Sequence, residues 1–208
     1  YGWLDDFDPH WTPNTTDAGG RRYRYAQQPA VAQWNLVRLA EALAVAFDDP
    51  APLQAGLDRF GAVYSAEYET MVAAKLGLPA LDGDARALAQ EGFALLAAAE
   101  ADYTLFFRAL GELAALGSGA LPADDGALLD ALGNVFYDEG KRAAHAGALA
   151  AWLRRWHARA AAAGGTGEAR RARMHAVNPK YVLRNYLAQQ AIEAAEVGDD
   201  SLVHTLLE

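Results

Sequence analysis

The amino-acid sequence predicts an all-α fold. From residue 29 almost to the end, apolar residues recur every three or four positions, which is the period of an amphipathic helix. Breaks containing Gly and Pro divide this region into segments of helical length. No segment alternates apolar and polar residues as a half-buried strand does. With 208 residues, 52% of them hydrophobic, the chain is long enough to form a real core.

The first 28 residues are the exception, because no helical or alternating period runs through them. Turn-forming residues are frequent there, as in Asp8-Pro9, Thr12-Pro13-Asn14 and Gly19-Gly20. We call residues 1–28 the head, and we predict a long ordered loop because its aromatic residues need a surface to pack on. Loops of this length are uncommon unless they are functional. The aromatic residues are Trp3, Phe7, Trp11, Tyr23 and Tyr25.

The helical region is predicted to begin at Pro29, since proline suits the first position of a helix. Asp84 and Asp102 can each cap the helix that follows them. The expected helices of the first half are Pro29 to the stop at Asp48-Asp49-Pro50, Leu53 to about Gly77, Asp84 to Leu96, and Tyr103 to Leu116.

The second half contains two Gly-rich breaks, near residues 117–123 and 164–167, which are possible linkers. The sequence thus predicts two parts, the head at 1–28 and a helical domain at 29–208. The expected helices are one capped by Asp124 or Asp125, one with Leu149, Trp152, Leu153 and Trp156 on a single face, a short basic one after Gly167, one opened by Asn178-Pro179 and stopped at Gly198, and one from Asp200 towards Leu207.

Composition and charge exclude several classes of function. With 18 basic and 27 acidic residues, the net charge of −9 disfavours broad nucleic-acid binding and a basic membrane-surface anchor. The absence of Cys excludes disulfides, thiol nucleophiles and Cys-ligated metals. No apolar run approaches the ~20 residues that span a bilayer. The Ala- and Arg-rich composition suggests a bacterial gene, and we expect a cytoplasmic protein.

The acidic head is a candidate metal site, because Asp5, Asp6, Asp8 and Asp17 lie near Asn14 and hard cations prefer such oxygens. Their spacing does not fit a calcium-binding loop. Asp and Asn that bind their own backbone in turns explain the pattern as well. A small metal-dependent hydrolase would require tight divalent-metal binding that is lost when Asp5 and Asp8 are changed to Ala.

Other patterns give no activity. The five His residues are scattered, and no Ser lies in a G-x-S-x-G motif. Gly164-Gly165-Thr166-Gly167 lacks the Gly-Lys-Ser/Thr ending of a phosphate-binding loop and follows a helix rather than a strand. We therefore interpret these residues as a helix stop and a linker. The residues alone predict a helical domain with an unusual aromatic and acidic head.

Several longer stretches carry a resemblance to one known family. The first and last are long and specific, and together they bracket almost the whole chain, whereas residues 117–165 carry little that matches. The matching stretches are 1–9, 12–17, 20–25, 28–29, 34–40, Asp102-Tyr103-Thr104, Phe107-Arg108, Asn178 to Asn185, and 188–192. In these stretches the chain resembles the selenoprotein O family, also called the YdiU or UPF0061 family.

The resemblance implies a protein-kinase-like fold that transfers AMP from ATP to Ser, Thr or Tyr hydroxyls of proteins, with Mg and ATP as cofactors. The family's phosphate-binding, catalytic and metal-binding motifs precede the equivalent of Tyr1. The last of them is an Asp-Tyr-Gly-Pro stretch immediately before it. We therefore carry over no catalytic, cofactor-binding or metal-binding residue, expect none of these cofactors on this chain, and expect a fragment truncated at both ends.

On this view the head corresponds to an activation segment beside the active site. Asp5, Asp8, Asn14 and Asp17 are the residues expected to shape it. The helices that follow would be the C-lobe and helical extension of the kinase-like fold, a non-catalytic scaffold. Arg184 and Asn185 are expected to tie helices together, and a buried Arg needs a carboxylate partner. The expected partners are the N-terminal kinase-like half and protein substrates. The alternative is a non-enzymatic helical interaction module.

Overall fold

The computed structural model describes residues 3–14, 16–17 and 19–207 of the chain. Within those residues the chain forms nine α-helices and no strand, so the predicted all-α class is confirmed. Short 3-10 turns flank the first helix at Tyr25–Gln27 and Ala44–Ala46. The α-helices are α1 (Gln28–Leu43), α2 (Ala51–Lys75), α3 (Gly83–Ala98), α4 (Tyr103–Ala115), α5 (Asp125–Asp130), α6 (Glu139–Ala162), α7 (Gly167–Val177), α8 (Asn185–Glu196) and α9 (Ser201–Leu207).

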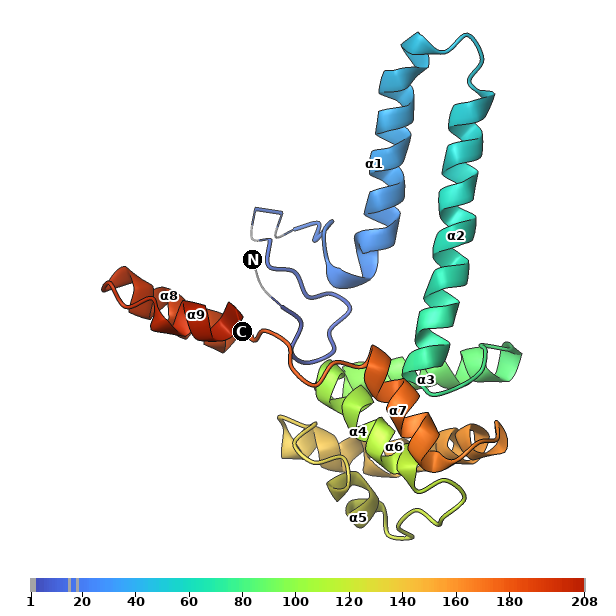
Figure 1. Ribbon diagram of the computed structural model, residues 1–208, viewed down its shortest axis with the longest axis vertical. Helices are drawn as coiled ribbons and strands as arrows, with labels where there is room; N and C mark the ends of the chain where they lie inside the picture. The colour runs from blue at the N-terminus through green and yellow to red at the C-terminus, as the bar shows by residue number, and fades with distance from the viewer. Residues whose placement is uncertain (1–2, 15, 18, 208) are drawn as a thin grey trace.

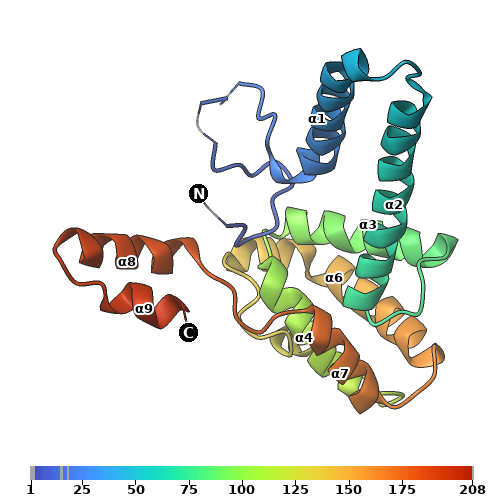
Figure 2. The same ribbon diagram turned by 45° about the horizontal axis from the view of Figure 1, so that its top comes forward.

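The helices form three groups. The helices α3 to α7 gather into a compact unit, which we call the body, with α3 packed on α6 and α4 packed on α7. The helices α1 and α2 form an antiparallel hairpin that extends away from the body (Figure 1). The helices α8 and α9 form a second, shorter hairpin on another side (Figure 2). The described part of the head lies between these two projections.

The core of the body is built around two tryptophans of α6. The Trp152 and Trp156 rings stack with their centroids 6.3 Å apart, and each is almost completely buried. Both indole N–H groups donate to backbone carbonyls, Trp152 to Leu88 at 2.8 Å and Trp156 to Leu76 at 2.9 Å. A Cβ added at Gly92 would lie 2.6 Å from the Trp152 ring, so only glycine lets α3 approach α6 this closely. The prediction that these two tryptophans lie on a single face of one helix is confirmed.

Every helix of the body begins with a capping side chain. Asp102 accepts a hydrogen bond from the Leu105 N–H at 2.7 Å, as predicted, and Asp124 rather than Asp125 caps α5. The prediction of Asp84 as a cap was wrong. Asp82 accepts from the Ala85 N–H at 2.9 Å, and α3 begins directly after it, at Gly83. Such caps satisfy N–H groups that have no partner inside the helix.

The helix predicted from Asn178-Pro179 was also placed wrongly. Asn178 ends α7, and α8 begins only at Asn185. The Asn178 side chain is buried, accepting from the Lys75 ammonium at 3.0 Å and donating to the Lys75 carbonyl at 3.1 Å. This long-range contact to the end of α2 takes the place of the local capping bond that the sequence pattern predicted.

The α1–α2 hairpin has little cover. Val31 is the only buried residue of α1, and only Val72 and Ala73 are buried among the 25 residues of α2. Both α2 residues lie in its last turn, where the helix meets the body. Across the described residues, no helix is long and apolar enough to cross a membrane.

Candidate functional site

The described head is joined to the body by backbone hydrogen bonds. The Phe7 N–H donates to the Ala101 carbonyl at 2.9 Å, and the Tyr103 N–H donates to the Asp5 carbonyl at 3.1 Å. On the other side of this short segment, the Asp102 N–H donates to the Val135 carbonyl at 2.7 Å. The residues just before α4 are therefore held between the head and the loop after α5.

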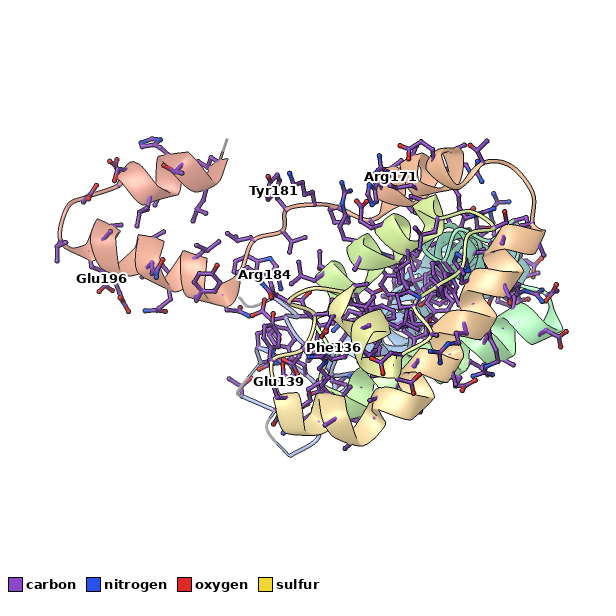
Figure 3. The ribbon with its side chains drawn as sticks, turned by 90° about the horizontal axis from the view of Figure 1, so that it is seen from below. Phe136, Glu139, Arg171, Tyr181, Arg184 and Glu196 are labelled. Atoms are coloured by element: carbon purple, nitrogen blue, oxygen red, sulfur yellow. The ribbon has the colours of Figure 1, made fainter. Side chains whose placement is uncertain are left out.

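An ion cluster lies where these segments meet. The Arg184 guanidinium donates to both carboxylate oxygens of Asp102, at 2.7 and 3.3 Å, and to Asp5 Oδ1 at 3.1 Å. The Tyr137 hydroxyl donates a further hydrogen bond to Asp102. Asp102 is fully buried and the Arg184 side chain is 14% exposed. Figure 3 shows Arg184 on the chain that leads into α8, where that chain leaves the body.

Asn185 extends this cluster to the start of the described head. Its Oδ1 accepts from the Trp3 N–H at 2.8 Å, and its Nδ2 donates to the Trp3 carbonyl at 2.6 Å and to Asp5 Oδ2 at 3.0 Å. The reciprocal pair with the Trp3 backbone fixes the head against the first residue of α8. We call Asp5, Asp102, Tyr137, Arg184 and Asn185 the clamp.

The clamp is electrostatically satisfied. Burial lowers the pKa of Arg184, but the hydrogen bonds to Asp102 and Asp5 outweigh it and the net pKa is raised. Burial, and then the bond to Asp102, raise the pKa of Tyr137 well above its ordinary value. The guanidinium stays charged and the phenol stays protonated at neutral pH. Removing one partner would leave a buried charge uncompensated, which is strongly unfavourable. This arrangement holds the head in place.

The four head residues singled out in the sequence are not brought together. Asp5 belongs to the clamp, while the other three stabilise local turns. Asp8 Oδ1 accepts from the His10 N–H at 2.8 Å, and Asn14 Oδ1 accepts from the Thr16 N–H at 3.0 Å. Asp17 accepts from the Gly20 and Arg22 N–H groups at 3.2 and 2.8 Å. These are the turn bonds that the sequence pattern offered as the alternative to a metal site.

The described part of the chain does not fit a magnesium or other metal centre. No three His, Asp or Glu residues in it are grouped so that they could hold a metal ion. The head carboxylates accept hydrogen bonds from N–H groups instead. We therefore derive no chemical step through a metal from these residues.

A large apolar cleft lies beside the clamp, between the head, the base of the α1–α2 hairpin and helices α3 and α4. Its volume is about 950 Å³. Aromatic side chains from all four segments face it, and among its described lining residues Glu67 is the only charged one. Its floor is a packed aromatic group in which Phe7 stacks on Tyr103 with 5.4 Å between centroids. The main lining residues are Phe7, Tyr25, Phe60, Tyr64, Tyr68, Met71, Phe93 and Tyr103.

Sequence reasoning found some members of the clamp and missed others. It gave Asp102 only a capping role and left the carboxylate partner of Arg184 open. Residues 82 positions apart form that pair, so no local pattern could identify it. Tyr137 lies in a region that carried no signal, and the apolar cleft was not predicted at all.

Together these features define an all-helical protein that holds an irregular aromatic and acidic segment on a compact helical body. The family model described as "Protein adenylyltransferase SelO" matches residues 1–208. The chain therefore belongs to the SelO family of protein adenylyltransferases, as the resemblance implied. Adenylyltransferases of this family use ATP.

Curated bacterial relatives agree. A protein nucleotidyltransferase YdiU of Xanthomonas campestris pv. campestris (strain 8004) is 54% identical over all 208 residues, and one of Azoarcus sp. (strain BH72) is 50% identical. The similarity covers 100% of this chain but 38% of each relative. The chain thus spans little more than a third of the length of the curated relatives that it matches.

Proposed function

We propose that this chain is the C-terminal helical part of a SelO-like protein adenylyltransferase, and that it acts as a non-catalytic scaffold. In the full-length protein, AMP would pass from ATP to Ser, Thr or Tyr hydroxyls of protein substrates. The observation that carries this proposal is the clamp, because it fixes the head against the body through partly buried, charge-assisted hydrogen bonds. Family membership over the whole chain supports the parent activity.

The proposal assigns the head the position of an activation segment, which borders the protein substrate in kinases. Helices α1 to α9 would be the C-lobe of a kinase-like fold and its helical extension. Asp5 would set the start of the head through the clamp. Asp8, Asn14 and Asp17 would set its turns, so that this irregular segment presents one shape to a substrate.

The proposal places ATP and magnesium on the part of the full-length protein outside this chain. Nucleotidyl transfer depends on positioning and on cationic stabilisation of the phosphates. The described residues contribute the fixed geometry of the head, not the metal ligands. The bacterial relatives support a bacterial origin, and a cytoplasmic location stays a prediction.

The test uses the full-length protein with Mg-ATP labelled in the adenylyl group. The wild-type protein should transfer labelled AMP to protein hydroxyls. An Asn185→Ala variant should keep its fold but lose at least about tenfold in transfer, because the start of the head is no longer tied to α8. Gln189→Ala is the matched control, since Gln189 is exposed on α8 and bonds only Glu193, one turn away.

Two results would contradict the proposal. If the full-length protein transfers no AMP, the parent activity is wrong. If it does transfer AMP and Asn185→Ala is as active as Gln189→Ala, the clamp does not position the head for the reaction.

The alternative is a non-enzymatic helical interaction module. The uncovered α1–α2 hairpin is the observation that bears on it, because an autonomous module is expected to hide its apolar faces. Sedimentation of the 208-residue chain separates the two. A stable monomer that binds no apolar dye favours an autonomous module, and an oligomer that binds the dye favours a scaffold that normally packs on more of its own protein.

A further inference from the structure

The apolar cleft at the base of the α1–α2 hairpin leaves large aromatic side chains exposed to solvent, which is unfavourable unless another molecule or segment covers them. On α2, Tyr64, Tyr68 and Met71 lie at intervals of four and three residues, so they form one stripe that faces the cleft. They are 38%, 42% and 44% exposed. Exposed apolar patches of this kind mark places where something binds.

One part of the α2 stripe is covered by another segment and one part is not. Farther from the body, towards the start of α2, the stripe continues through Phe60, Leu57 and Leu53, which are partly covered where α1 lies beside α2 in the hairpin. Phe60 also lines the near end of the cleft. Closer to the body, the stripe residues Tyr64, Tyr68 and Met71 face the cleft instead of another helix. The Phe60, Tyr64 and Tyr68 rings stack in sequence at 6.2 and 6.0 Å, so the covered and uncovered parts form one continuous aromatic surface.

We propose that an apolar segment of the same full-length polypeptide, from outside residues 1–208, fills this cleft and covers the stripe on α2. The inference rests on the proposed function, in which this chain is the scaffold part of a longer protein. It adds the surface on which the rest of that protein packs, and the chemistry of the segment that meets it.

Two observations select this occupant. The relatives are more than twice as long as this chain, which covers 38% of each, so the full-length protein of the proposed function has a large amount of further polypeptide covalently joined to this chain. A covalently tethered segment binds at a high effective concentration and needs little intrinsic affinity. The lining is mostly apolar, with Gln28, Glu67 and tyrosine hydroxyls as its polar groups, which matches the side chains of a protein core better than a charged ligand.

The experiment replaces Tyr68 in the full-length protein with a benzophenone amino acid, which cross-links to nearby C–H bonds on illumination. Mass spectrometry then identifies the peptide attached to it. The expected product joins Tyr68's position to a peptide from outside residues 1–208 of the same molecule. The matched control places the same group at Val63, which is 48% exposed on α2 but does not line the cleft. There the yield of that product should fall at least about tenfold.

Each other result overturns the proposal. A covalent dimer means that a second copy covers the stripe. A product confined to residues 1–208, an adduct with a small co-purified molecule, or no product means that the cleft is not filled by the rest of the polypeptide. Equal yields from both positions mean that the cleft is not the contact. The readout needs no AMP transfer, so its failure is distinguishable from failure of the proposed function.

Thermal unfolding of the full-length protein provides a second measurement. Tyr64→Lys should lower the Tm by about 3 °C or more, because it places a charge in a filled apolar cleft. Val63→Lys, at the residue directly before Tyr64, should change the Tm by less than about 1 °C, as for an exposed site. Equal shifts for the two variants would also overturn the proposal.

Discussion

The body and the α1–α2 hairpin are both helical and both amphipathic, yet they differ in how their apolar residues are used. In α4, six of 13 residues are buried, and α6 buries both Trp152 and Trp156. In α2, two of 25 residues are buried. A helical period therefore predicts that apolar side chains line one face of a helix. The tertiary structure decides whether another segment covers that face.

The helix starts differ in the same way. The five helices of the body begin with Asp or Thr side chains that accept from the helix backbone, Asp82, Asp102, Asp124, Asp138 and Thr166. At α1, α2 and α8 the preceding residues Gln27, Pro50 and Arg184 form no such bond. The body thus carries its own local and tertiary stabilisation, whereas the hairpin has less of both. This comparison predicts where substitutions will matter.

The largest effect is expected in the core of the body. Trp152→Ala should lower the free energy of unfolding of the chain by about 4 kcal/mol, because it leaves a cavity and an unpaired Leu88 carbonyl. Urea unfolding measures this change. Trp34→Ala on α1 is the matched control and should cost under about 1 kcal/mol, since Trp34 is 46% exposed and contacts the Arg22 guanidinium 4.0 Å from its ring. Similar costs would remove the distinction between body and hairpin.

The next effect is expected at the clamp. Arg184→Ala should destabilise the chain by about 3 kcal/mol, because the buried Asp102 carboxylate loses its countercharge. Hydrogen exchange should also show faster exchange at the Phe7 and Tyr103 amides, which join the head to the body. Arg38→Ala removes an exposed pair with Glu41 and should cost under about 0.5 kcal/mol. The clamp would lose its assigned role if the two variants behaved alike.

A smaller effect is expected at a helix start. Asp124→Ala removes the side chain that accepts from the Ala127 N–H, so it should cost about 1 kcal/mol. Gln27→Ala before α1 should cost under about 0.5 kcal/mol, since it removes a hydrogen bond from Arg24 at 3.0 Å but no capping bond. Thermal unfolding of both variants tests whether capping distinguishes the two regions, and a Gln27→Ala cost equal to that of Asp124→Ala would show that it does not.

The smallest effect is a pH dependence from the body. Burial, and then the nearby Arg170 guanidinium, lower the pKa of His157 below its ordinary value. The unfolded chain therefore takes up a proton at a higher pH than the native chain does. The contribution of neutral His157 to the free energy of unfolding is fully present above the ordinary His pKa of about 6.5. It declines as the pH falls below that value. His157→Gln should flatten the stability profile between about pH 7 and pH 5, whereas an unchanged slope would assign the effect to other groups.

Local patterns predicted much of the fold. The helices containing Leu36 and Leu39, Leu88, or Trp152 and Trp156 follow from apolar spacing, and the capping role of Asp102 follows from its residue type and position. Patterns failed where a distant residue competed with a local bond. Asn178 binds Lys75 across 103 positions instead of starting a helix. The cap of α3 was a different, local error, because Asp82 rather than the nearby Asp84 accepts the capping bond.

The candidate site was predictable only in part. The sequence marked Asp5, Asp8, Asn14 and Asp17 by composition, and the turn bonds of the last three are local enough to infer. It could not join Asp5 to Arg184, because 179 residues separate them. The apolar cleft was invisible for the same reason, since its walls come from four separate segments.

The sequence by itself determined the helical class, most helix positions and membership of the SelO family, because periodicity, capping chemistry and long matching stretches are properties of neighbouring residues. Only the tertiary structure decided which stripes are covered, which carboxylate meets Arg184 and where the cleft opens. Those outcomes depend on contacts between residues far apart in the chain, whose energies arise only when the segments have packed together.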